Sequence, residues 1–132
     1  MIREFLKWLD PRSDEPDQVT NIKPITDQPA LDRALQAPLA VVYKHSPFCG
    51  VSSWARREVE RFATEHPDVQ VFQIDVIQSR DVSDAIEELF GVRHQSPQAF
   101  LVRRGTPAWT GSHRSISANT LERELGPVHE SG

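Results

Sequence analysis

From residue 20 onward, the order of apolar patterns constrains the fold more than any other feature of this sequence. Short apolar runs alternate with segments whose apolar residues recur at helical spacing. The runs predict strands at 21–26, 39–43, 69–74, 99–103 and 108–110. The periodic segments predict helices at 30–37, 51–65, 82–90 and 118–125. We therefore expect an α/β protein, a three-layer sandwich in which parallel strands joined by helical crossovers precede an antiparallel hairpin.

Length and composition agree with one such domain. The chain has 132 residues, of which 38% are apolar and 26% charged, as in soluble globular proteins. Its net charge of −4 argues against a nucleic-acid partner, which basic domains usually bind. No apolar run approaches the roughly 18 residues of a membrane span, so we expect no membrane partner. The one cysteine excludes a disulfide scaffold and an all-cysteine zinc site within the chain, and the scattered histidines lack metal-ligand spacing, so no metal is expected.

The two ends of the chain differ from this central pattern. Residues 1–9 place apolar side chains at helical spacing but are interrupted by charges, which predicts a short amphipathic helix rather than a secretory signal. Such a helix docks on the domain or binds a surface or partner. Residues 10–17 hold two prolines and four acids, which is typical of a linker. We thus assign 1–18 to helix and linker, 19–127 to the domain and 128–132 to a tail, in a cytoplasmic protein.

Reactive chemistry is expected where the second predicted strand meets the longest helix. This junction, 44–52, reads KHSPFCGVS and contains Cys49 beside Lys44 and His45. The carboxyl ends of strands form the ligand-binding edge of an α/β sheet, and helix N-termini favour anions. A helix N-terminus and nearby cations both lower a thiol pKa and increase the thiolate fraction. The alternative is a small buried apolar cysteine. The position of Cys49 at the start of a helix favours a reactive thiol.

Ser52 stands three residues after Cys49, giving a C-x-x-S arrangement. A cysteine at this place could close a disulfide with Cys49, whereas serine cannot. A mixed disulfide at Cys49 would therefore be resolved by a thiol from outside the chain. The Ser52 hydroxyl is a candidate donor to the sulfur, or alternatively a helix cap.

A second candidate segment is 91–98, GVRHQSPQ, in which Ser96 and Pro97 open a predicted strand. The position suits a cis X-Pro bond, although spacing alone leaves the trans form favoured. A cis bond would turn the Ser96 backbone toward the thiol. Arg93 and His94 would stand on the same rim and attract an anionic partner, or else form a solvated basic turn.

These segments carry a family resemblance. The order of elements resembles the thioredoxin fold, and the residues more narrowly resemble the monothiol bacilliredoxin family. The matching residues are KHS at 44–46, C-x-V-S at 49–52, GVRHQSPQ at 91–98 and WTGSH at 109–113. The resemblance covers roughly residues 20–125. It implies a thioredoxin-like sandwich with a mixed sheet of four to five strands and a cis bond before Pro97.

Three residues depart from the patterns of related proteins. Gly50 occupies a place where the bacilliredoxin family usually has proline, and Phe48 one where it commonly has a small polar residue. Glycine frees one more backbone N–H near the sulfur, and phenylalanine makes the rim more apolar. Tyr43 stands six residues before the cysteine, where thioredoxins have a buried aspartate. This fits a site with no internal disulfide to resolve.

The resemblance also implies a function. We expect a monothiol thiol–disulfide oxidoreductase of the stress response, which removes bacillithiol from S-bacillithiolated proteins through a mixed disulfide on Cys49. Bacillithiol would be a co-substrate, with no permanently bound cofactor, and the protein would act as a monomer. The catalytic residues would be Cys49 and Ser52. Residues expected to bind substrate or stabilise the thiolate are Lys44, His45, Phe48, Gly50, Arg93, His94, Ser96, Pro97, Gln98 and His113.

Two other functions remain open from the sequence. C-G-V-S at 49–52 differs by one residue from the C-G-F-S of monothiol glutaredoxins, which carry iron–sulfur clusters. Those proteins hold glutathione with a Gly-Gly-x-Asp stretch, and here the corresponding residues are Gly111, Ser112 and His113. The second alternative is a thioredoxin-like adaptor without catalysis, for which the Cys49 pKa would be unperturbed.

Overall fold

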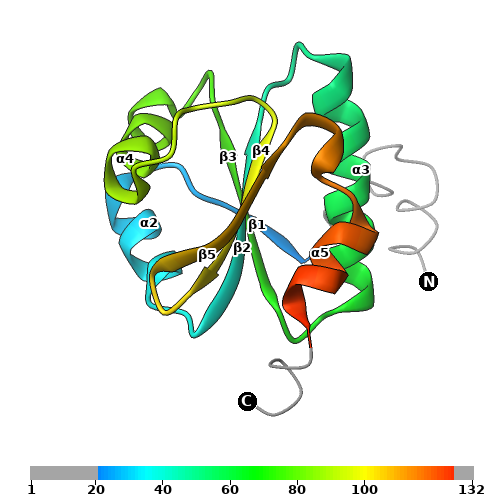
Figure 1. Cartoon of the computed structure of the whole chain (residues 1–132). Helices are drawn as coiled ribbons and strands as arrows, with labels where there is room; N and C mark the ends of the chain where they lie inside the picture. The colour runs from blue at the N-terminus through cyan, green and yellow to red at the C-terminus, as the bar shows by residue number, and fades with distance from the viewer. Residues whose placement is uncertain (1–20, 127–132) are drawn as a thin grey trace, which may run out of the picture.

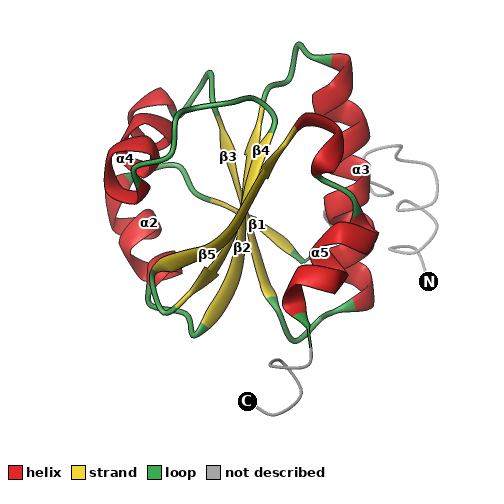
Figure 2. Cartoon of the chain, viewed as in Figure 1, coloured by secondary structure: helices red, strands yellow, loops and turns green. Residues whose placement is uncertain are grey.

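The described part of the structure, a computed structural model, is residues 21–126. The predicted N-terminal helix and linker and the C-terminal tail lie outside these residues. Figure 2 shows one twisted sheet between two layers of helices. The sheet has five strands in the order β1-β3-β2-β4-β5. The strand bounds are β1 Ile22–Pro24, β2 Leu39–His45, β3 Gln70–Asp75, β4 Gln98–Arg103 and β5 Thr106–Ser112.

The strand directions follow the predicted scheme. β3 pairs in parallel with both β1 and β2, whereas β4 runs antiparallel to both β2 and β5. β2 is the central strand, and residues 40–44 on it are all buried. Residues 39–43 of this strand are a continuous apolar run, as expected where helices cover both faces of the sheet.

Each face of the sheet carries its own apolar core. The helices are α2 Gln28–Leu35, α3 Gly50–Glu65, α4 Arg80–Phe90 and α5 Ala118–Leu125, and a 3₁₀ helix, η3, spans His113–Ser115. One core joins the sheet to α3 and α5, and the other joins it to α2 and α4. Figure 1 shows these two pairs of helices on opposite sides of the sheet. The predicted three-layer sandwich and strand number are therefore confirmed.

The boundaries differ from the sequence prediction in physically simple ways. β1 is shorter than predicted and ends at Pro24, although the Ile25 N–H still donates to the Gln73 carbonyl of β3 at 2.8 Å. β5 is longer than predicted because it follows β4 across an irregularity between Leu101 and Val102. α3 begins at Gly50, one residue before the predicted start. These differences move no element to another layer.

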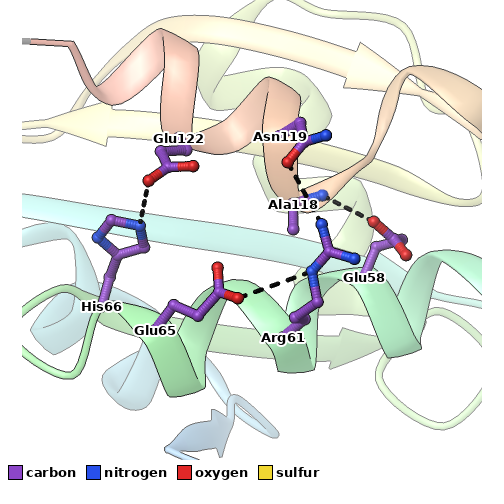
Figure 3. A network of polar contacts seen from close by, with 7 residues as sticks. All are labelled: Glu58, Arg61, Glu65, His66, Ala118, Asn119 and Glu122. Atoms are coloured by element: carbon purple, nitrogen blue, oxygen red, sulfur yellow. Dashed lines mark hydrogen bonds and ion pairs between the residues drawn. The ribbon is translucent and has the colours of Figure 1, made fainter.

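Polar contacts fasten α5 to the C-terminal half of α3, as Figure 3 shows. The Ala118 N–H donates to Glu58 Oε1 at 2.9 Å, and Arg61 donates to Asn119 at 3.3 Å. Near the end of α3, His66 lies 3.5 Å from a carboxylate oxygen of Glu122. The N-terminal turn of α3 takes no part in these contacts. Within residues 21–126, no helix is long and apolar enough to cross a membrane.

Candidate functional site around Cys49

Cys49 occupies the N-cap of α3, directly after the loop that follows β2. Its backbone is extended, with φ −120° and ψ 126°, and its side chain is partly exposed. The Cys49 N–H donates to the Ser46 carbonyl at 3.3 Å, which closes the loop before the helix. The sulfur is therefore not a small apolar group enclosed in the core. It stands at the N-terminus of a 16-residue helix, where unpaired N–H groups face outward.

The surroundings of Cys49 make its thiol more acidic. The backbone N–H of Ser52 is the largest cause of the lowered Cys49 pKa, followed by the N–H of Val51. The Ser52 hydroxyl lowers it further, while slight burial opposes the shift. These N–H groups act on the sulfur electrostatically, because the Cys49 side chain accepts no capping hydrogen bond of ordinary geometry. The start of α3 thus favours the thiolate, which is the nucleophilic form of cysteine.

Ser52 links the helix to the loop before it. Its side chain is fully buried, and its Oγ accepts a hydrogen bond from the Ser46 N–H at 3.2 Å. Accepting from Ser46 leaves the hydroxyl proton available for the Cys49 sulfur. The Ser52 side chain therefore holds the loop before α3 and also lowers the pKa of the Cys49 thiol.

Tyr43 and His45 lie on the α3 side of β2. The Tyr43 hydroxyl donates to the Ser52 carbonyl at 2.9 Å and lies 3.0 Å from His45 Nδ1. Because Tyr43 gives its proton to Ser52, Nδ1 is the donor in the contact with His45. Burial lowers the pKa of His45, and the nearby Arg56 guanidinium lowers it further. His45 is therefore mainly a neutral hydrogen-bonding group at neutral pH.

Lys44 points to the opposite face, because neighbouring residues of a strand alternate between faces. It is fully buried, and its Nζ lies 3.2 Å from His94 Nδ1 and 6.0 Å from the centre of the Phe100 ring. Burial lowers the Lys44 pKa to about 8, although Glu87 and Asp84 oppose the shift. The structure thus brings Lys44 and His94 to each other, and neither is among the causes of the lowered Cys49 pKa.

The loop before β4 is held at several points. The Ser96–Pro97 peptide bond is cis, and the Pro97 carbonyl accepts from the His113 N–H at 3.1 Å. Gln98 is buried and donates through Nε2 to the Arg93 carbonyl at 2.9 Å. Ser96 Oγ is buried and makes no hydrogen bond with the described residues. Ser96, Pro97 and Gln98 therefore form a fixed loop tied to the start of η3.

The remaining predicted site residues lie on the surface. Phe48 is 86% exposed, and Gly50, Arg93 and His113 are also exposed. His113 has a φ of 54°, in the left-handed region that non-glycine residues rarely adopt. Phe48 directly precedes Cys49 in the sequence and exposes an apolar ring to solvent.

Several residues that contact the predicted site were absent from the sequence prediction. Arg56 acts on His45 and Tyr43, and its place one helical turn after Ser52 could have indicated this. Ser83 Oγ lies 3.4 Å from His94 Nδ1, and Glu87 accepts from the His94 N–H at 3.1 Å. Both come from α4, and no sequence motif connects them to His94. Within residues 21–126, no group of His, Cys, Asp and Glu could hold a metal ion.

Comparison with known families decides the relationship of this chain. The model of the family described as monothiol bacilliredoxin BrxC matches residues 22–121. The chain belongs to the monothiol bacilliredoxin family. The resemblance seen in the sequence is thereby confirmed, and family and fold together indicate a role in thiol redox chemistry.

Solved structures similar to this bacilliredoxin have the thioredoxin fold. One protein described as having that fold is 27% identical, with a TM-score of 0.76, and the match covers 83% of this chain and 96% of that one. Thioredoxin from Trypanosoma brucei brucei is 15% identical, with a TM-score of 0.72 over 85% and 94% of the two chains. A poplar thioredoxin h mutant is 19% identical, with a TM-score of 0.68 over 86% of each chain. The predicted thioredoxin-like fold is confirmed.

Proposed function

We propose that this bacilliredoxin removes bacillithiol from S-bacillithiolated proteins by thiol–disulfide exchange at Cys49. The observation that carries the proposal is a partly exposed thiol at the N-cap of α3, whose pKa is lowered by the N–H groups of Ser52 and Val51. Family membership supports bacillithiol as the small thiol. The protein substrates would be cytoplasmic, and the protein would act as a monomer.

The exchange proceeds in two steps. The Cys49 thiolate attacks the bacillithiol sulfur of the modified protein, so that a Cys49–bacillithiol disulfide forms as the protein–bacillithiol disulfide breaks. The substrate thiolate leaves and takes a proton from solvent. A second thiol then attacks the new disulfide and releases Cys49. This second thiol comes from another molecule because the sequence contains one cysteine.

The residues around Cys49 would have different roles in this exchange. The Ser52 and Val51 N–H groups and the Ser52 hydroxyl stabilise negative charge on sulfur, both before attack and when Cys49 leaves. Ser96 and Pro97 supply a fixed loop whose backbone would pair with the substrate. Phe48 offers an apolar contact beside the sulfur. Lys44 and His45 support these elements from within the fold.

The direct test uses a purified protein carrying bacillithiol on one cysteine. Wild-type protein should release the modification and show a mass increase of one bacillithiol at Cys49, and added bacillithiol should then remove this adduct. Cys49→Ser should release none above the rate with bacillithiol alone, whereas Ser53→Ala, an exposed serine in the same turn, should act like wild type. Equal release by Cys49→Ser and wild type would contradict the proposal.

A further inference from the structure

A cavity of about 350 Å³, lined by both polar and apolar side chains, opens beside the loop that leads to Pro97. Its lining includes Val76 after β3, Ser83 and Glu87 of α4, and His94 of the loop. The Val76 N–H donates to the His45 carbonyl at 2.9 Å, and Cys49 follows His45 by four residues. In Figure 1 the connections β2–α3, β3–α4 and α4–β4 lie at the same end of the sheet. The cavity therefore shares that end of the molecule with the sulfur.

His94 lines this cavity, and its contact with Lys44 sets the tautomer of its ring. The Lys44 ammonium can only donate, so His94 Nδ1 accepts in their 3.2 Å contact and the ring proton lies on Nε2. The backbone N–H of His94 is held by the Glu87 carboxylate at 3.1 Å. Lys44 is itself fully buried behind the ring. His94 thus lines the cavity in a defined tautomer and orientation, and its Nε2–H can serve a carboxylate or hydroxyl.

Charges of both signs line the same cavity. Arg80, at the start of α4, contributes a guanidinium, while Asp84 and Glu87 contribute carboxylates one and two turns later. Glu87 already accepts from His94, which leaves Asp84 as the more exposed carboxylate. A ligand that fits must offer both a negative and a positive or hydroxyl-bearing group. A plain apolar molecule or a simple anion would leave half of these groups unmatched.

We propose that this cavity binds the non-thiol part of a low-molecular-weight thiol bearing both carboxylate and ammonium or hydroxyl groups, while its sulfur is bonded to Cys49. The proposal rests on the proposed exchange function and assigns the recognition of the small thiol to Arg80, Asp84 and His94. In the step concerned, the Cys49 thiolate attacks a symmetric disulfide of the small thiol. One sulfur–sulfur bond forms, the original one breaks, and the departing thiolate takes a proton from solvent.

The experiment compares two disulfides with the reduced full-length protein. Bacillithiol disulfide carries the groups that the cavity would bind, whereas bis(2-hydroxyethyl) disulfide has no charged group. For each protein we take the ratio of the two second-order rates of mixed-disulfide formation at Cys49, measured by quenched-flow mass spectrometry. The ratio cancels changes in the nucleophilicity of Cys49 that affect both reactions equally.

Arg80→Gln and Asp84→Asn should each lower this ratio by about fivefold or more, since each removes a charged contact to one disulfide alone. Arg57→Gln, which removes an exposed charge of α3 outside the cavity, should keep the wild-type ratio. Ratios within about twofold of wild type in both cavity variants, or an equal fall in Arg57→Gln, would overturn the assignment. A wild-type ratio near one would instead refute bacillithiol as the small thiol of the proposed function.

Discussion

The hydroxyl of Tyr43 donates a hydrogen bond to the backbone carbonyl of Ser52 at 2.9 Å. The contact joins the buried centre of β2 to the first turn of α3. Ser52 is also the residue whose N–H contributes most to lowering the Cys49 pKa. Burial raises the pKa of the Tyr43 hydroxyl well above its ordinary value, so the proton needed for this bond is retained. The core of the sheet thereby holds Ser52, the residue whose N–H acts on the thiol, through its carbonyl.

Tyr43→Phe should lower the free energy of unfolding by about 1–2 kcal/mol, because the ring packing is kept while buried partners lose the hydroxyl. Urea denaturation at pH 7 measures the change. Thr64→Val, which removes an exposed hydroxyl from α3, should change stability by less than about 0.5 kcal/mol. An unchanged unfolding free energy in Tyr43→Phe would show that its two hydrogen bonds contribute no net stability.

Ser52→Ala should raise the pKa of the Cys49 thiol, because it removes one hydroxyl donor to the sulfur. The pKa should still lie below that of an ordinary thiol, since the Ser52 and Val51 N–H groups remain. At pH 6 iodoacetamide should therefore alkylate the variant more slowly than wild type. The pH profile of the alkylation rate gives the Cys49 pKa in each of the two proteins. His45→Gln serves as the comparison, since His45 is not among the causes of the shift and its variant should titrate like wild type. A larger pKa rise in His45→Gln than in Ser52→Ala would contradict this account.

Lys44 should make stability increase with pH. Its pKa is about 8 in the folded protein and 10.5 in its ordinary state, so the unfolded chain binds more protons between these values. The cost of burying the charge is fully present below pH 8 and disappears as pH rises toward 10.5. Between pH 7 and 9.5, wild type should gain roughly 1–3 kcal/mol of unfolding free energy relative to Lys44→Met. Denaturant titrations at several pH values measure this, and a constant difference between the two proteins would refute it.

Gly50→Pro should be tolerated and should stabilise the fold by about 0.5–1 kcal/mol, since proline suits the first position of a helix and restricts the unfolded chain. An added Cβ at Gly50 meets nothing within 4 Å, and the extended backbone of Cys49 is compatible with a following proline. The Cys49 pKa should stay lowered because the N–H groups responsible belong to Val51 and Ser52. Thermal unfolding and alkylation rates check the two statements.

Gly91→Ala provides the contrast for this prediction. Its Cβ would also meet nothing within 4 Å, but the φ of Gly91 is 68°, which disfavours any side chain. This variant should lose about 1 kcal/mol of stability. A destabilised Gly50→Pro together with an unchanged Gly91→Ala would show that backbone conformation does not decide these positions.

The sequence by itself determined the layers of the fold and the place of the thiol. Alternating strand and helix periods required a sheet covered on both faces, and the position of Cys49 between β2 and α3 put it at a helix N-terminus. Both follow from local patterns of neighbouring residues. The residues that identify the bacilliredoxin family were also readable along the chain.

Only the tertiary structure decided which contacts the residues near that thiol make. Lys44 and His45 are adjacent in sequence, but the pleat of β2 sends them to opposite faces, one against His94 and the other against Tyr43. Burial then lowers the pKa of both side chains, which leaves Lys44 mainly charged and His45 mainly neutral at neutral pH. Ser83 and Glu87, the partners of His94, come from a helix that begins more than 35 residues after Lys44. Burial and long-range contact depend on how the layers pack, which local sequence patterns do not specify.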